Sequence, residues 1–344
     1  MFAYQAFFFD NWSCYKINKR TSNMKKIVLT SFTVVICLAL CVVGLISGFN
    51  PSPLQVETLK VLGTICGAAA LYCFVVGEIA RNNSQMDKLW SLLPIAYVWV
   101  IAAMGGMKPR LLIIAILVTA WGLRLTFNFA RKGAYSIRFW EGEEDYRWPI
   151  LRSNKPFDNK FVWALFDLFF ISVYQNLLVL LICLPALAVM ESNASLGLFD
   201  FFAAGFAALF LFLECVADEE QWVFQTNKHR MLKEGKALSD LPNPYNLGFN
   251  TRGLWGHMRH PNYLGEQGFW VSLYVFVIGA GTANFALFHW TIVGPALLIL
   301  LFLGSSTFGE NISSRKYPLY QEYCRSVPKY IFWKRYVPKQ EENE

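Results

Sequence analysis

The chain alternates long uncharged apolar runs with short polar connections. A helix needs about 20 apolar residues to cross roughly 30 Å of hydrocarbon, and most of the runs approach that length. The strands of a membrane barrel would instead appear as alternating segments of about ten residues, and this pattern does not occur in the sequence. We therefore expect an all-α polytopic membrane bundle of about eight transmembrane helices, at residues 27–49, 61–77, 89–107, 111–130, 161–190, 195–213, 263–283 and 285–304.

Composition supports a lipid environment. Hydrophobic residues make up 55% of the chain and charged residues 16%, whereas about 25% of an ordinary soluble domain is charged. We expect residues 1–26 to be an N-terminal cytoplasmic leader, 27–60 to form the first span with its loop, and 61–344 to form the main membrane domain. Met24 followed by two lysines is similar to a bacterial start, so residues 1–23 are expected to be an upstream extension or a disordered leader. We expect the protein in the bacterial inner membrane.

Lysine and arginine gather in the polar segments before the first run, after the fourth and after the sixth. Because basic loops stay on the cytoplasmic side, we expect both termini in the cytoplasm. Lys108 and Arg110 are the exception, since they fall in a loop on the opposite side. The net charge of +7 is accounted for by the basic loops, so we expect the lipid bilayer as a partner, with no nucleic acid and no required protein partner.

Strongly polar residues also occur inside the apolar runs. Such groups are costly in hydrocarbon, so they are expected to face the bundle interior or a wet cavity. They are Arg124, Asp167, Gln175, Asn176 and Glu214. Arg124 lies near the cytoplasmic end of its run, where a snorkelling side chain is an alternative.

The polar segment 253–270 passes directly into an apolar run. Pro261 is suited to the first position of a helix, which would place Asn262, Tyr263 and Glu266 on one side. Arg259 and His260 would flank a helix N-terminus whose free N–H groups suit a phosphate. A helix start anchored at the membrane interface explains the same residues equally well.

No metal is expected at this segment. His257 and His260 lie three residues apart, but no further Cys or His is near them. The eight cysteines form no C-x-x-C pair and fall mainly within apolar runs, so we expect neither disulfides nor structural zinc.

Several ordered motifs resemble a known family. The sequence R-H-P-N-Y-L-G-E at 259–266 is followed by Trp270, preceded by E-x-x-x-D at Glu214 and Asp218, and joined by R-K-Y-P-L-Y-Q-E-Y at 315–323. This set resembles the C-terminal domain of the steroid 5-alpha-reductase family, above all its bacterial branch of uncharacterised membrane proteins. QMDKLWS at 85–91 and EEDYRW at 143–148 also resemble that branch, so the likeness runs from about residue 60 to the C-terminus.

The resemblance implies NADPH as cofactor and hydride transfer to a carbon–carbon double bond conjugated to a carbonyl, in a steroid-like or other hydrophobic lipid. Asn262 and Glu266 would hold the nicotinamide end or ribose. Tyr263, Arg259 and His260 belong to the same helix start. The remaining cofactor contacts implied are Asp218, Arg315, Lys316 and Tyr323, with the adjacent Arg315 and Lys316 suited to a 2′-phosphate. The Rossmann fingerprint G-x-G-x-x-G is absent from the sequence.

Reduction of an enone also needs a proton donor near the developing enolate oxygen. Tyr146 in EEDYRW is the candidate, with Asp145 to orient it and Asp87 to assist. A cytoplasmic loop held together by Arg147 and its acidic neighbours is an equally good explanation of this motif.

A second reaction class fits some of the same residues. Isoprenylcysteine and phospholipid methyltransferases of the membrane are similar in having R-H-P-x-Y at a helix start, where they bind S-adenosylmethionine. The extended N-Y-L-G-E, the E-x-x-x-D and the distal tyrosine-rich motif favour the reductase. A transporter would need repeated halves, and none is visible in the sequence.

Overall fold

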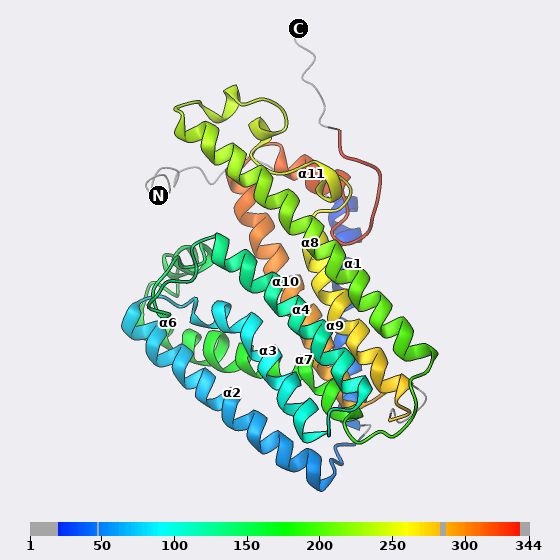
Figure 1. The fold of residues 1–344 in the computed structure, drawn as a ribbon. Helices are drawn as coiled ribbons and strands as arrows, with labels where there is room; N and C mark the ends of the chain where they lie inside the picture. Colours follow the sequence, from blue (N-terminus) through cyan, green and yellow to red (C-terminus); the bar gives the residue numbers. More distant parts are fainter. Residues whose placement is uncertain (1–19, 47, 283–286, 338–344) are drawn as a thin grey trace.

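A computed structural model describes residues 20–46, 48–282 and 287–337, and its regular structure within these residues is helical (Figure 1). Residues 167–174 form a π-helical turn that continues directly into the next helix. The helices are α1 (Arg20–Ile46), α2 (Pro53–Ala80), α3 (Gln85–Met104), α4 (Pro109–Arg131), α5 (Arg147–Arg152), α6 (Lys160–Phe166), α7 (Gln175–Val189), α8 (Leu198–Lys233), α9 (Pro261–Gly279), α10 (Val293–Lys316) and α11 (Tyr320–Ser326). The predicted all-α class is confirmed.

Six helical segments among the described residues are long and apolar enough to cross a membrane. They are α2, α3, α4, the continuous segment Lys160–Val189, α8 and Trp290–Lys316. The other two predicted spans correspond to shorter or more polar helices: the apolar part of α1 is Thr30–Ile46, and α9 opens with polar residues. The chain is thus an integral membrane protein with multiple spans.

Two predicted boundaries involve residues outside the described part of the chain. Residues 1–19 of the predicted leader lie outside the described residues, and the chain is already helical at Arg20, before the predicted start of the first span at residue 27. The boundary between the last two predicted spans, around residues 283–285, falls at 283–286, which also lie outside the described residues.

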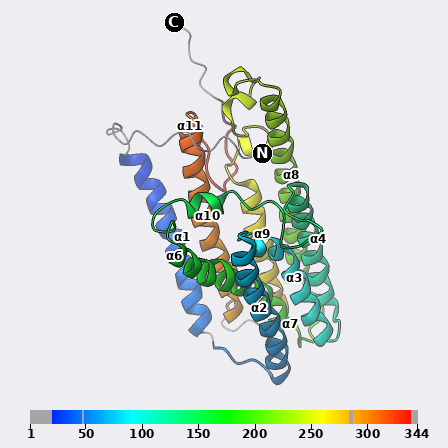
Figure 2. The same ribbon diagram turned by 90° about the vertical axis from the view of Figure 1, so that its left-hand side faces the viewer.

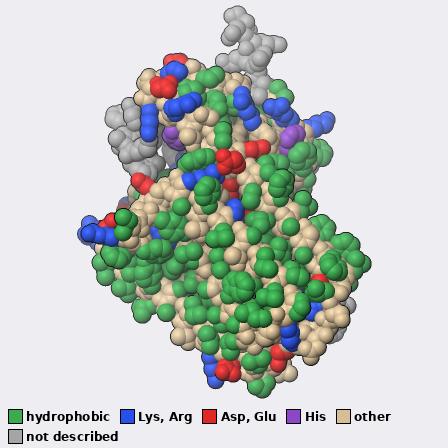
Figure 3. All heavy atoms as spheres, viewed as in Figure 1, with side chains coloured by type: hydrophobic (Ala, Val, Ile, Leu, Met, Phe, Trp, Pro, Cys, Tyr) green, Lys and Arg blue, Asp and Glu red, His purple; other side chains and the backbone are tan. Residues whose placement is uncertain are grey.

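The helices lie side by side, with α8 and α10 extending beyond their neighbours at one end (Figure 1). Residues 234–260 and α11 cover this extended end, and α1 packs against α10 at the edge of the bundle (Figure 2). Green apolar side chains cover the body in Figure 3, whereas many of the basic side chains gather on the upper part. Outward-facing residues such as Ile79, Phe212 and Leu45 suit contact with lipid tails.

Helix starts follow local sequence signals. Ser52 caps α2 in a reciprocal pair with Gln55, which satisfies backbone N–H groups that the first turn leaves unpaired. Pro53, Pro109 and Pro261 occupy first-turn positions of α2, α4 and α9, where a missing N–H removes no helical bond. The predicted start of a helix at Pro261 is confirmed.

Arg110 does not act as a loop charge. Its guanidinium is buried and bonds both carboxylate oxygens of Asp200 at 2.6 and 2.9 Å, and it donates to the backbone oxygens of Ala194 and Ser195. Gly279 permits the close approach, because a Cβ there would lie 2.9 Å from Asp200. A buried, fully bonded cation contributes little to the charge of a loop. Lys108 is therefore the one member of the pair that still departs from the expected placement of basic loops in the cytoplasm.

Polar residues within the apolar runs face inward, as the sequence predicted. Asp167, Gln175, Asn176 and Glu214 are all buried. Asp167 accepts a hydrogen bond from Asn83 at 2.8 Å, and Asn176 donates to the backbone oxygen of Ser172 at 2.7 Å. Bonding inside the bundle offsets the cost of removing these groups from water.

Candidate functional site

Three carboxylates surround one arginine where α4, α8 and α9 meet. The guanidinium of Arg124 lies 2.6 Å from Glu214, 2.6 Å from Asp218 and 3.3 Å from Glu266. We call these four side chains the carboxylate cluster. Glu214 is fully buried and Glu266 nearly so, so each ionised carboxylate there needs compensation from a neighbouring cation or donor.

Neutral donors complete the cluster. Trp121 donates its indole N–H to Glu266 at 2.9 Å, and Asn128 donates to Asp218. Trp121, Arg124 and Asn128 follow one face of α4 at helical spacing, whereas Glu214 and Asp218 lie one turn apart on α8. The E-x-x-x-D motif therefore presents both acids to α4. Arg124 takes the predicted interior position and not the snorkelling alternative, because three acids hold its guanidinium.

Gly265 permits α9 to approach α8 closely enough to complete the cluster. A Cβ at Gly265 would lie 2.3 Å from the Cγ of Glu214 and 2.9 Å from the backbone oxygen of Phe210. Such distances are far below van der Waals contact, so a side chain at this position would push the two helices apart. The L-G-E part of the motif thus places Glu266 against Arg124.

The start of α9 carries an amide oxygen without a partner. The Oδ1 atom of Asn262 is buried and has no hydrogen-bond partner within the described protein. The Tyr263 ring stacks on His260 with centroids 5.1 Å apart and meets Phe302 edge-on at 4.6 Å. An unpaired buried acceptor is costly, and a ligand amide or hydroxyl at this helix start would satisfy it.

Arg259 and His260 are bound within the protein. Arg259 donates to Glu310 at 2.7 Å and to the backbone oxygens of Cys324 and Val327, and His260 lies 2.9 Å from Glu310. Burial lowers the pKa of His260, although Glu310 opposes this shift. Burial acts against the charged form of Arg259, but Glu310 outweighs it and raises the pKa of Arg259 above its ordinary value. These two residues hold the C-terminal segment against the start of α9.

The motif at 85–91 holds the loop that precedes EEDYRW. Lys88 is buried and donates to the backbone oxygens of Phe139 and Glu141 at 2.7 and 2.6 Å, and Gln85 donates to that of Trp140 at 3.0 Å. Three successive carbonyl groups are thus fixed by the first turn of α3. The structure brings together two motifs that are more than 50 residues apart in sequence.

The same helix start also contacts EEDYRW itself. Asp87 accepts a hydrogen bond from the indole of Trp148 at 2.8 Å. Asp145 pairs with Arg147 at 2.7 Å, and Arg147 also donates to Ser305 of α10 at 3.2 Å. Burial opposes the ionised form of Asp145, but the charge and hydrogen bonds of Arg147 prevail and lower the pKa of this carboxyl. EEDYRW is therefore a braced loop in which Asp145 and Arg147 are paired, with Tyr146 between them.

The side chain of Tyr146 is partly exposed to solvent but is also partly surrounded by protein. Its side chain is 46% exposed, yet desolvation by the protein around it raises the pKa of the phenol to about 12. Lys132, at the end of α4, behaves similarly: it is exposed, and desolvation lowers its pKa while Asp218 and Asp145 oppose that shift. Both groups thus reach solvent while protein lies close to them on their other sides.

Tyr146 and Lys132 lie near several of the predicted residues. Tyr263 and Tyr317 are close enough to Tyr146 to raise the pKa of its phenol, and Asp218 and Asp145 are close enough to Lys132 to oppose the lowering of its pKa. The catalytic candidates of the EEDYRW loop therefore neighbour both the carboxylate cluster and the start of α9. In Figure 3 red and blue side chains gather across the middle of the face, between the apolar body and the upper part.

The distal predicted residues divide into two groups. Arg315 and Lys316 are exposed at the end of α10, where they can meet a phosphate from solvent. Tyr323 is only 2% exposed and donates to the backbone oxygen of Trp255. It packs in a cluster with Phe249, Tyr320 and other aromatic residues. Its predicted contact with the cofactor stays a prediction, and its observed bonds hold α11 against residues 247–258.

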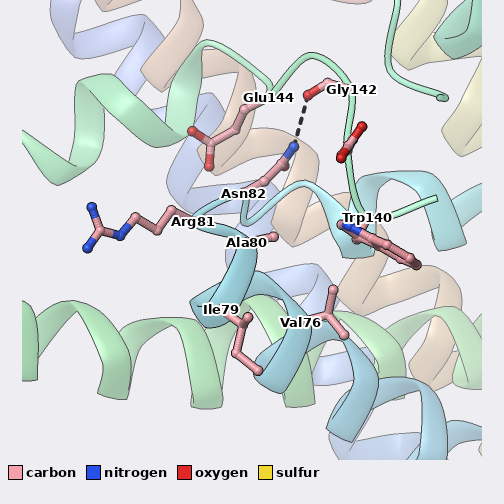
Figure 4. Close-up of a pocket in the computed structure, with 9 residues that line it drawn as sticks. Val76, Ile79, Ala80, Arg81, Asn82, Trp140, Gly142 and Glu144 are labelled. Carbon is pink, nitrogen blue, oxygen red and sulfur yellow. Dashed lines mark hydrogen bonds between the residues drawn. The ribbon is translucent and has the colours of Figure 1, made fainter. Parts of the chain in front are cut away.

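A cavity lies between the braced loop and the end of α2. It has a volume of about 840 Å³ and lies between the end of α2, including Val76 and Ile79, and the loop residues Trp140, Gly142 and Glu144 (Figure 4). Asn82 closes one side by donating to the backbone oxygen of Gly142. None of the predicted site residues lines this cavity, so it does not bear on the chemistry proposed for them.

Sequence analysis missed several residues of the candidate site. Trp121, Asn128, Lys88 and Glu310 were not singled out, although each bonds a predicted residue or its loop. A usable signal existed for the first two, because they share the helical face of Arg124 in an otherwise apolar run. Within the part of the chain that the structure describes, no three His, Cys, Asp or Glu side chains are grouped to hold a metal ion, and the metal-free site stays a prediction.

The residues present fit a dinucleotide in part. The unpaired Asn262 oxygen suits the carboxamide or a ribose hydroxyl, and the exposed Arg315 and Lys316 suit a phosphate. Asp218, Glu266 and Arg259 are already bonded within the protein, so any contact with a cofactor would share or replace those bonds.

Comparison with known proteins places the chain in a family. The family model described as a protein of unknown function (DUF1295) matches residues 73–327, a range that contains every predicted site residue. An uncharacterized protein of Schizosaccharomyces pombe is 33% identical over 295 residues, which cover 82% of this chain and 80% of that protein. No solved structure matches the chain. The family is related to the steroid 5-alpha-reductase-like families, and the chain belongs to the DUF1295 family of membrane proteins.

Proposed function

We propose that this protein is an NADPH-dependent membrane reductase that acts on a carbon–carbon double bond conjugated to a carbonyl in a hydrophobic lipid. The observation that carries the proposal is that three features neighbour one another near the start of α9. These are the unpaired Asn262 oxygen at the start of α9, the carboxylate cluster, and the phenol of Tyr146. The resemblance to the steroid 5-alpha-reductase family supplies the reaction type.

The residues that carry these three features, with Arg315 and Lys316, would bind and orient the cofactor. NADPH, when bound, supplies the hydride. Asn262 would accept a hydrogen bond from its nicotinamide end, and Arg315 with Lys316 would bind the phosphate end. Trp121 and Arg124 hold Glu266 in one orientation, so that its carboxylate would meet a ligand hydroxyl without first having to be ordered.

Tyr146 would hold the proton that the product requires. A phenol with a pKa of about 12 is fully protonated at neutral pH, so it can donate a hydrogen bond to a carbonyl oxygen. Asp145 and Arg147 fix the backbone on either side of it through their ion pair. Asp87 would assist indirectly, because its bond to Trp148 fixes the other end of the motif.

A second function is favoured by the charge of the cluster. Glu214, Asp218 and Glu266 share a single arginine, and such an excess of acids would attract a cationic group. The sulfonium of S-adenosylmethionine carries that charge, so methyl transfer to a membrane substrate is the alternative activity.

The two functions separate in one experiment on the purified full-length protein in nanodiscs. For a reductase we expect saturable binding of NADPH and loss of its absorbance with at least one member of a panel of enone lipids. Binding of S-adenosylmethionine and transfer of its labelled methyl group, without any binding of NADPH, would instead establish the methyltransferase. Binding of neither compound would refute both proposals.

A further inference from the structure

Residues 328–336, which we call the C-terminal strap, run alongside the segment that leads into α9. The backbone N–H groups of Arg259 and His260 donate to the oxygens of Pro328 and Lys329 at 3.0 and 3.1 Å. Farther along, Trp333 and Tyr336 donate to the oxygens of His257 and Gly256 at 3.2 and 2.8 Å. Because backbone bonds fix the strap at both ends, its outward side chains have a defined position.

Contacts with α10 set the depth of the strap along the bundle. Lys329 donates to Ser306 and Thr307 at 3.1 Å, and Tyr330 lies 3.1 Å from Ser306. Ser306 precedes the last residue of α10, Lys316, by ten positions, which corresponds to about 15 Å along a helix. The strap therefore folds back from the extended end to the edge of the apolar stretch of α10, the part of this helix that is suited to hydrocarbon.

At this depth the strap presents apolar and basic side chains outward. Ile331, Phe332 and Trp333 are 61%, 60% and 58% exposed, although one face of Phe332 stacks on His257 at 4.3 Å. Lys334 and Arg335 follow directly and are also exposed. Consecutive large apolar residues are unfavourable in water, whereas an aromatic and aliphatic tip beside cations suits the boundary between hydrocarbon and headgroups.

We propose that the C-terminal strap is an interfacial anchor for anionic phospholipid in the leaflet at its own end of the bundle. Residues 331–333 insert among the headgroups and upper acyl chains, and Lys334 with Arg335 bind lipid phosphates. Because the strap is bonded to residues 256–260, this anchoring also holds the start of α9 in place. The proposal does not depend on which reaction the protein catalyses.

Photo-crosslinking tests the insertion directly. Phe332 is replaced by p-benzoylphenylalanine in the full-length protein, which is placed in nanodiscs of phosphatidylcholine and phosphatidylglycerol. The matched control carries the same group at Leu319, which is 39% exposed beyond the end of α10. We expect lipid adducts at position 332 and few at position 319. Adducts to a second copy of the chain, or equally few lipid adducts at both positions, would overturn the proposal.

Charge reversal tests the preference for anionic lipid. Near an anionic surface each basic residue is worth roughly fivefold in association. We therefore expect backbone amides of the strap to exchange hydrogen several times more slowly in phosphatidylglycerol than in phosphatidylcholine nanodiscs. The double variant Lys334→Glu with Arg335→Glu should lose this difference. The control variant Arg325→Glu, an exposed cation of α11, should retain it. Equal exchange of the unmodified protein in both lipids would contradict the proposed role of the charges.

Discussion

The guanidinium of Arg124 and the carboxylate of Glu214 lie 2.6 Å apart in the interior of the bundle. Arg124 belongs to α4 and Glu214 to α8, and Glu266 of α9 completes the contact. One cation thus holds three helices through acids that would otherwise repel one another. The arrangement explains why a chain with few charges keeps four of them together at this depth.

Replacing Arg124 should lower the stability of the protein more than replacing one of the acids of the carboxylate cluster. Arg124→Met leaves three unpaired carboxylates, and breaking a buried pair in this way costs about 3–5 kcal/mol. We expect a clear fall in the unfolding temperature measured in detergent. Adding Glu214→Gln to Arg124→Met should restore part of the stability, because it removes one of the repelling charges. A double variant less stable than Arg124→Met would contradict this account of the cluster.

Close contact between α8 and α9 predicts a penalty for any side chain at Gly265. Gly265→Ala places a Cβ against Glu214 and the backbone of Phe210, and overpacking of this kind costs about 1–3 kcal/mol. Gly205→Ala, also within a helix but with open space around the added Cβ, is the matched control and should leave the unfolding temperature unchanged or slightly higher. Equal stability of the two variants would show that the helices can separate without cost.

Sequence alone placed the polar residues on the correct side of their helices but did not give their partners. The cost of a strongly polar side chain in hydrocarbon predicts that it faces the bundle interior, and this was sufficient for Asp167 and Glu214. This cost does not indicate which residue of another helix lies opposite. The contact of Arg124 with Glu266 depends on the close approach of α9 to α8 at Gly265, and that of Arg259 with Glu310 joins residues about 50 positions apart.

Sequence signals predicted correctly the features that depend on residues adjacent in the chain. Pro261 marked the start of α9 correctly because the chemistry of a helix N-terminus lies within one turn. The motif EEDYRW was singled out in the sequence. The hydrogen bonds by which Lys88 and Gln85 hold the preceding loop go to backbone carbonyl groups, so the side-chain pattern could not predict them. Backbone acceptors are the same at every residue, so such contacts become visible only in the structure.

Asn262 should contribute to cofactor binding without contributing to folding. Its Oδ1 atom has no partner in the described protein, so Asn262→Ala breaks no internal bond of that atom. We expect about tenfold weaker binding of NADPH, as for the loss of one hydrogen bond to a ligand, with an unchanged unfolding temperature. Gln267→Ala on the same helix, which removes bonds within the protein to the backbone of Tyr263 and to Tyr330, should leave NADPH binding unaltered. Unchanged affinity in Asn262→Ala would remove this residue from the proposed site.

Tyr146→Phe should slow the reaction without weakening the cofactor complex. The substitution removes only the phenolic hydroxyl, and loss of a proton donor typically lowers kcat by about 100-fold or more. Tyr135→Phe is the matched control, because it loses a hydroxyl that bonds the backbone of Lys88; it should retain kcat while losing some stability.

The pH dependence distinguishes a proton donor from a structural tyrosine. Desolvation raises the pKa of Tyr146 to about 12, above the ordinary value of about 10. The phenol is therefore protonated below that pKa, and its ability to donate is lost only as the pH rises through about 12. Accordingly, kcat should show no loss from this group at neutral or mildly alkaline pH. If kcat instead falls along a titration near pH 7 that disappears in Tyr146→Phe, Tyr146 titrates in a far more polar setting than the braced loop provides.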